Sequence, residues 1–181
     1  VDLSYQSSTS STRGATGVRA VAMGLKTTAS GTNSTAMGNL TTASGNQTTA
    51  MGFQSTASGD SSTAIGRSTT ASGSYSTAMG QSTTASGDNS TALGYYTSAS
   101  GGYGAIAMGN QTTASGANST VMGEGGTASG AASTAMGRGT TASDYASLVI
   151  GQYNSSGSSV TNNATSFNTA NTAFVIGNGT D

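Results

Sequence analysis

The sequence contains no cysteine, no histidine, no proline and no tryptophan. Without histidine and cysteine, the chain lacks the commonest general base, the thiolate nucleophile and the usual ligands of structural zinc. The absence of proline, beside 28 glycines in 181 residues, excludes a collagen-like triple helix. We therefore expect no catalytic centre, no metal site and no cofactor, and we expect that the protein is not an enzyme.

Charged residues are also scarce, with five Lys and Arg against six Asp and Glu. Proteins that neutralise nucleic-acid phosphates need a basic surface, which this composition cannot supply. The longest apolar run is too short to span a bilayer. We expect no nucleic-acid partner and no direct membrane insertion of this segment.

Glycine recurs every seven residues from Gly17 to Gly94, and the interval resumes from Gly109 to Gly137 after a one-residue insertion near 102–104. A fixed period indicates a repeat architecture. Seven is also the coiled-coil period, but a Gly in every heptad would cost a helix about 1 kcal/mol relative to Ala. Segments such as 34–37 (Ser-Thr-Ala-Met) are instead typical of short strands, with glycine and variable residues in the turns between them.

Successive sevens differ, because Thr-Ala-Met-Gly at 35–38 alternates with Thr-Ala-Ser-Gly at 42–45 along most of the chain. The sequence therefore predicts an all-β fold, a parallel β-solenoid or β-roll with 14-residue coils and two short strands per coil. Coils stacked about 4.8 Å apart would form a rod roughly 45 Å long. We assign residues 1–14 to an N-terminal cap, 15–151 to the repeat and 152–181 to a C-terminal cap or transition segment.

Side chains alternate across a strand, so Ala36 and Ser34 share one face while Met37 and Thr35 share the other. The near-constant Ala predicts a narrow lumen lined by alanine, with the hydroxyls of Thr27, Thr41, Ser62, Ser76 and Ser90 also pointing inward. The alternative is that Met fills the lumen and Ala faces outward. That arrangement would also bury the Ser at the same phase of the partner strand.

With alanine inside, one strand type presents an outward column of large apolar residues, named here the apolar stripe. It consists of Met23, Met37, Met51, Ile65, Met79, Leu93, Met108, Met122, Met136 and Ile150. Burying each such side chain is worth about 1.5–3 kcal/mol, and a stripe of this length in solvent would be unusually large. We expect it to be the seam of a closed homo-oligomer, with a second copy of the chain as partner.

The other strand type presents outward Thr and Ser, named here the hydroxyl ladder. Its clearest members are Thr28, Ser30, Thr42, Ser44, Thr56, Ser58, Thr70 and Ser72. Their spacing, about 6.7 Å along a strand and 4.8 Å between coils, is of the kind that matches a lattice such as ice. Rows of Ser and Thr are equally the ordinary outside of a polar solenoid, so both interpretations stay open.

Aromatic residues gather near the insertion. Tyr95, Tyr96 and Tyr103 are either a contact patch for a ligand or packing around the extra residue. We take them as a candidate contact patch.

The alternation of Ser-Thr-Ala-Met-Gly (34–38) and Thr-Thr-Ala-Ser-Gly (41–45) resembles the head repeats of trimeric autotransporter adhesins of the YadA type, over about 17–151. Met replaces the usual Ile of that family in most coils, although Ser-Thr-Ala-Ile-Gly at 62–66 is almost the family form. The resemblance implies a left-handed β-roll, three of which pack side by side as a homotrimer.

The same resemblance implies a non-enzymatic, extracellular head at the cell surface, which attaches to host cells, matrix or abiotic surfaces by multivalent contacts. The neck, stalk and membrane barrel of such adhesins are not recognisable in this sequence, so we expect outer-membrane anchoring through sequence not present here. Two other functions fit the pattern: an ice-binding solenoid that uses the hydroxyl ladder, and a segment of a phage or viral fibre.

Overall fold

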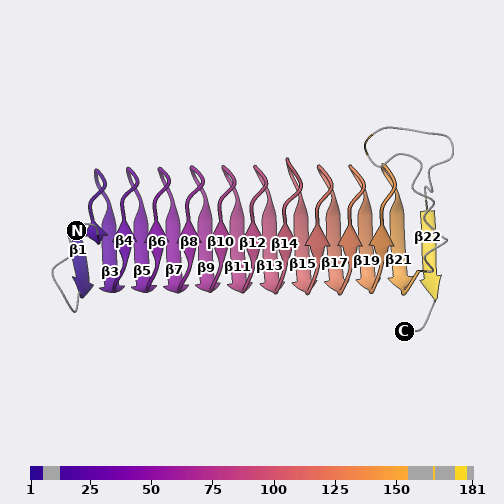
Figure 1. Cartoon of the computed structure of the whole chain (residues 1–181), viewed down its shortest axis with the longest axis horizontal. Helices are drawn as coiled ribbons and strands as arrows, with labels where there is room; N and C mark the ends of the chain where they lie inside the picture. Colours follow the sequence, from indigo (N-terminus) through magenta and orange to yellow (C-terminus); the bar gives the residue numbers. More distant parts are fainter. Residues whose placement is uncertain (6–12, 155–164, 166–173, 179–181) are drawn as a thin grey trace.

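The computed structural model describes residues 1–5, 13–154, 165 and 174–178. All the secondary-structure elements among these residues are β-strands, and they form two parallel sheets that run the length of a rod (Figure 1). Each 14-residue coil supplies one long strand and one short strand. The prediction of an all-β parallel solenoid is therefore confirmed.

The long strands form a twelve-stranded sheet. In spatial order they are β1 (Asp2–Tyr5), β3 (Val21–Leu25), β5 (Thr35–Asn39), β7 (Thr49–Phe53), β9 (Thr63–Arg67), β11 (Thr77–Gln81), β13 (Thr91–Tyr95), β15 (Ile106–Asn110), β17 (Thr120–Glu124), β19 (Thr134–Arg138), β21 (Leu148–Gln152) and β22 (Phe174–Asn178).

The short strands form a ten-stranded sheet. They are β2 (Gly14–Ala15), β4 (Thr28–Ala29), β6 (Thr42–Ala43), β8 (Thr56–Ala57), β10 (Thr70–Ala71), β12 (Thr84–Ala85), β14 (Ser98–Ala99), β16 (Thr113–Ala114), β18 (Thr127–Ala128) and β20 (Thr141–Ala142).

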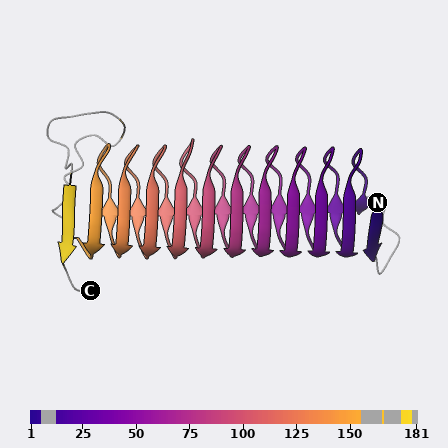
Figure 2. The same cartoon turned by 180° about the vertical axis from the view of Figure 1, so that it is seen from behind.

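Two rows of turns connect the sheets. The first turn edge joins each long strand to the short strand that follows it, and the second turn edge joins that short strand to the next long strand. Figure 1 shows the first turn edge at the bottom of the rod and the second at the top. Figure 2 shows the sheets from behind, with β1 and β22 at opposite ends. The two turn edges are therefore separate surfaces.

Alanine lines the lumen, as predicted. Ala36 on a long strand and Ala43 on a short strand are both fully buried, as are their equivalents along the rod. The alternative with Met inside and Ala outside is wrong. The predicted inward hydroxyls, from Thr27, Thr41, Ser62, Ser76 and Ser90, are buried too.

Of these five hydroxyls, that of Ser62 donates to the Ala71 carbonyl at 3.2 Å, and hydroxyls at the equivalent position of other coils also donate to backbone carbonyls. The Ser34 hydroxyl donates to the Gly31 carbonyl at 2.7 Å, and the Thr48 hydroxyl donates to the Gly45 carbonyl at 2.8 Å. Inside a narrow lumen such bonds offset part of the cost of burying a polar group.

Two features require the glycine that ends each Thr-Ala-Met-Gly motif: its backbone conformation and the lack of room for a Cβ. Gly38 has φ +122°, a conformation that side chains rarely allow, and a Cβ there would collide with the Gly52 carbonyl of the next coil. The glycine after each short strand is required by space alone, because its Cβ would collide with the next coil in the same direction. Asp144, which is fully buried, occupies this position after β20, the last strand of the ten-stranded sheet among the described residues.

Each turn contains one residue whose backbone lies in the left-handed region, with a positive φ. Leu40 on the first turn edge and Asn33 on the second both have φ +58°. This conformation directs the Leu40 N–H to the Leu25 carbonyl of the preceding coil at 2.9 Å. Stacked hydrogen bonds thus continue through the turns and offset the strain of about 1–2 kcal/mol per residue.

The predicted insertion lies on the second turn edge. Tyr103 bridges to Asp88, and the Gly104 N–H donates to the Asp88 carbonyl at 2.8 Å, as the corresponding turn residues do in regular coils. Gly102 is therefore the extra residue, and it is exposed. Strands β13 and β15 keep their register across it, with Leu93 beside Met108.

The end segments add one strand each to the twelve-stranded sheet, since β1 pairs with β3 and β22 pairs with β21. The rest of the predicted caps, at 6–12, 155–164, 166–173 and 179–181, lies outside the described residues. The cap boundaries at 1–14 and 152–181 stay predictions.

Candidate binding surfaces

The apolar stripe forms one straight column on the outer face of the twelve-stranded sheet. Strand pairing places Met37 beside Met51 and Met79 beside Leu93, and every other member beside its neighbour one coil away. Met79 is 40% exposed, and the other members are at the exposed limit or half-buried against their neighbours in the column. The structure thus leaves the column accessible along the whole rod.

The column is longer than the sequence predicted. Leu3 pairs with Met23 at one end and Ile176 pairs with Ile150 at the other, and these end residues are 62% and 68% exposed. A second column on the same face, two residues earlier in each strand, holds mostly half-buried threonine such as Thr35. Neither column contains a charged residue, so this part of the sheet is suited to burial against another surface.

The hydroxyl ladder lies on the outer face of the ten-stranded sheet. Thr28, Thr42, Thr56 and Thr70 pair in register from coil to coil and are half-buried. The serines two residues after each of them, Ser30, Ser44, Ser58 and Ser72, are exposed. The two faces of the rod therefore differ as predicted: one is apolar and the other hydroxylated.

The structure separates the three tyrosines of the predicted contact patch. Tyr95 and Tyr96 lie on the first turn edge, where their rings meet edge to face at 4.5 Å between centroids. Tyr103 lies on the second turn edge, in the turn between β14 and β15 (Figure 1). The prediction that all three tyrosines form one contact patch is therefore wrong, and the candidate patch is reduced to Tyr95 and Tyr96.

The second turn edge is polar, and its side chains bond to the next coil. Asn46 donates from its backbone N–H and its amide to the Asp60 carboxylate, at 2.9 and 3.2 Å. The backbone N–H of Ser74 donates to the Asp88 carboxylate at 2.9 Å in the same way. Many of the polar groups on this edge therefore form hydrogen bonds that stabilise the stacking of coils.

The first turn edge carries the ring contacts and the ion pair found among the described residues. The Arg67 guanidinium lies 5.9 Å from the centroid of the Phe53 ring. Further along, the Arg138 guanidinium lies 5.2 Å from the Tyr153 ring centroid, and Arg138 Nε lies 3.6 Å from Glu124 Oε2. Large aromatic and charged side chains on an exposed edge are typical of surfaces that contact ligands.

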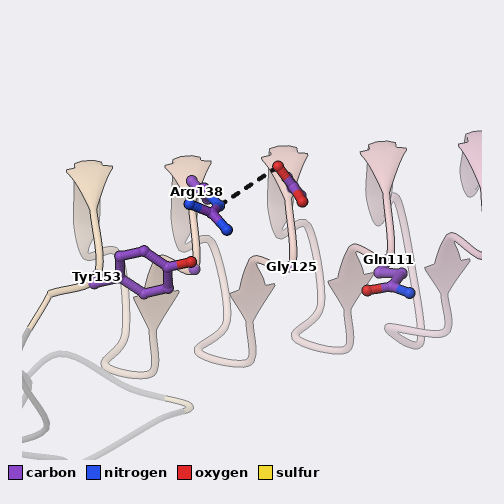
Figure 3. A pocket seen from close by; sticks show the side chains of 6 residues that line it. Gln111, Gly125, Arg138 and Tyr153 are labelled. Carbon is purple, nitrogen blue, oxygen red and sulfur yellow. Dashed lines mark ion pairs between the residues drawn. The ribbon is translucent and has the colours of Figure 1, made fainter. Parts of the chain in front are cut away.

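A hollow of about 260 Å³ opens on this edge, lined by Gln111, Glu124, Gly125, Arg138, Gly139 and Tyr153. Figure 3 shows Tyr153 and Gln111 at its two ends, with Arg138 between them. Sequence reasoning missed this hollow. Its signal was present, because Gly125 and Gly139 each lie two residues beyond the regular glycines Gly123 and Gly137.

No group of three or more His, Cys, Asp or Glu that could hold a metal ion occurs in the part of the chain that the structure describes. Likewise, none of the described residues forms a helix long and apolar enough to cross a membrane.

The repeat that builds these surfaces matches the family model of the YadA head domain repeat. Five successive segments match, at 15–41, 43–69, 71–97, 100–124 and 128–154, and together they cover well over half of the chain. The chain belongs to the YadA head repeat family. No curated protein matches the chain.

Membership in the YadA head family confirms the resemblance and indicates an adhesin-type surface function, because this is an adhesin domain family. The matched segments contain all ten members of the apolar stripe. The widest interval between them, 125–127, contains Gly125 of the hollow. The other residues that line the hollow lie within the matched segments.

Proposed function

We propose that this chain is the head of a cell-surface adhesin, in which three copies pack side by side through the apolar stripe. The observation that carries the proposal is the stripe itself, a straight, uncharged column that continues from Leu3 to Ile176. Most members are half-buried by stacking, while Leu3, Met79 and Ile176 are clearly exposed, and association would cover the apolar surface that remains accessible. Membership in the YadA head family supports the threefold count.

In this assembly the stripes face one another, while the hydroxyl ladder and other surfaces remain exposed. Three identical rods present each exposed feature three times, and coil repetition multiplies it further. Weak contacts to host cells, matrix or abiotic surfaces would then add up by avidity. The proposal places the chain outside the cell, anchored through sequence beyond this segment, and assigns it no enzymatic activity.

Cysteine cross-linking tests the seam, because the chain has no cysteine of its own. Met37 lies near one end of the rod, so a Met37→Cys variant cross-links to itself only if chains run in the same direction with their stripes together. We expect disulfide-linked dimers of Met37→Cys after mild oxidation. The matched control Ser44→Cys, on the opposite sheet, should remain uncross-linked. Equal cross-linking of both variants, or of neither, contradicts the seam.

Bead attachment tests the function. Beads coated with the assembled protein should bind to cultured epithelial cells or to a collagen-coated surface more than albumin-coated beads do. Attachment no greater than that of albumin on both surfaces contradicts the adhesin proposal.

Ice binding is a second candidate function, favoured by the in-register hydroxyl ladder, which includes no charged residue. Inhibition of ice recrystallisation by the protein, abolished by Thr56→Lys with Thr70→Lys, would support it. Growth of ice crystals at the rate seen with albumin would exclude it.

A further inference from the structure

We propose that the hollow on the first turn edge binds one neutral sugar residue of a surface glycan. This proposal deepens the attachment function and rests on it, because it names the ligand class that one surface of the head recognises. The hollow is formed by the first-edge turns of four successive coils, in which Gln111, Gly125, Gly139 and Tyr153 occupy equivalent positions.

Gly125 opens the hollow without being required by the fold. It occupies the left-handed turn position with φ +64°, and a Cβ built there meets nothing within 4 Å. Equivalent turn positions in other coils hold side chains in the same conformation, such as Ser68 with φ +55° and Gln111 with φ +56°. The backbone conformation at position 125 therefore does not require glycine, and the missing side chain leaves the hollow open.

Gly139 has a different role in the same turn position one coil further. A Cβ there would lie 2.5 Å from Cδ1 and Cε1 of Tyr153, so the glycine lets the aromatic ring lie close against the backbone. The Arg138 guanidinium also lies near this ring. The ring of Tyr153 thus forms a wall at one end of the hollow, opposite Gln111 (Figure 3).

The chemistry of the walls favours a neutral, hydroxylated ligand. Arg138 supplies donors, Glu124 supplies acceptors and the Gln111 amide supplies both. The guanidinium and the carboxylate pair at 3.6 Å, so their charges offset each other and the ligand need not carry charge. At about 260 Å³ the hollow is smaller than the 300–1,000 Å³ typical of drug-sized ligands, which suits one sugar ring.

The hollow also has a defined position relative to the seam. Glu124 and Arg138 each lie two residues after a member of the apolar stripe, at the end of the same strand of the twelve-stranded sheet. A trimer would therefore place three such hollows beside its seams, all at the same height. Three equivalent sites would convert weak binding of single sugars into stronger binding of branched glycans.

A glycan array tests the proposal with the assembled protein. The array carries neutral glycans that end in hexoses or N-acetylhexosamines, with sialylated glycans beside them. Gly125→Gln fills the hollow with the residue that the neighbouring coil carries at this position, and Ser68→Gln introduces the same side chain at an equivalent turn elsewhere. We expect the wild type and Ser68→Gln to bind the same neutral glycans, and Gly125→Gln to lose at least tenfold in signal.

On the array, three results would overturn the proposal: no binding of any neutral glycan, binding confined to sialylated glycans, or equal binding by Gly125→Gln. Circular dichroism and solution mass of both variants must match the wild type, as the tolerance of Gln111 at this turn position predicts. Bead attachment by the same proteins separates the two proposals. If Gly125→Gln beads attach as well as wild type, the sugar site fails while the adhesin function stands, and if no beads attach, the adhesin function fails.

Discussion

Val121 and Gly126 face each other within one coil, and a Cβ at Gly126 would lie 3.0 Å from Val121 Cγ2. Val121 stands in a lumen column that is alanine from Ala22 to Ala107 and that holds valine again at Val149 and Val175 in later coils. Gly126 stands in the column of buried hydroxyl residues, between Thr112 and Thr140. The larger residue in one column is thus accommodated by the smaller residue in the other.

This exchange of volume predicts coupling between the two positions. Gly126→Thr alone should overpack the lumen and lower the free energy of unfolding by about 1–3 kcal/mol. Combined with Val121→Ala, the same change restores the regular Ala and Thr pattern, so most of the loss should be recovered. Urea unfolding of the two single variants and the double variant gives the coupling energy, and strictly additive effects would contradict the account.

The glycine of the Thr-Ala-Met-Gly motif should be far more sensitive than an exposed turn glycine. Gly38→Ala forces φ +122° on a residue with a Cβ and drives that Cβ into the Gly52 carbonyl. We expect a loss of at least about 2 kcal/mol, since backbone strain and steric overlap act together. Thermal unfolding followed by circular dichroism measures this loss.

The matched control is Gly102→Ala. Gly102 is the extra residue of the insertion, and a Cβ there meets nothing within 4 Å. Its melting temperature should equal that of the wild type within about 1 °C, the shift expected of a change well below 0.5 kcal/mol. A comparable loss in both variants would show that the close approach of the coils is not the cause.

The ion pair between Glu124 and Arg138 should contribute little to stability. The side chains are 55% and 52% exposed, and exposed pairs are typically worth about 0–1 kcal/mol. Glu124→Gln should therefore change the free energy of unfolding by less than about 1 kcal/mol, with a difference that shrinks further in 1 M salt. A larger loss, independent of salt, would mean that the pair stabilises the stack.

Much of the fold could be predicted from the sequence because the repeat constrains it tightly. The two-residue alternation around Ala36 and Met37 decides which side chains enter the lumen, and lumen size excludes anything much larger than alanine. Both sheets, the coil length and the outward position of Met37 follow from this pattern. The structure confirms each of them.

Features outside the repeat could not be predicted as well. Leu3 and Ile176 extend the apolar column, but their registers depend on pairing with strands that are distant in sequence. Tyr96 and Tyr103 are close in sequence, yet half a coil separates them and carries them to opposite turn edges. The hollow was hidden because Gly125 is one glycine among many.

The central claim is that the apolar stripe holds three chains together, and the solution mass by light scattering tests it most directly. The wild type should have three times the mass of one chain, and a variant with Met37→Lys, Met79→Lys and Met122→Lys should have the mass of one chain. A folded wild type with the mass of a single chain would contradict the claim.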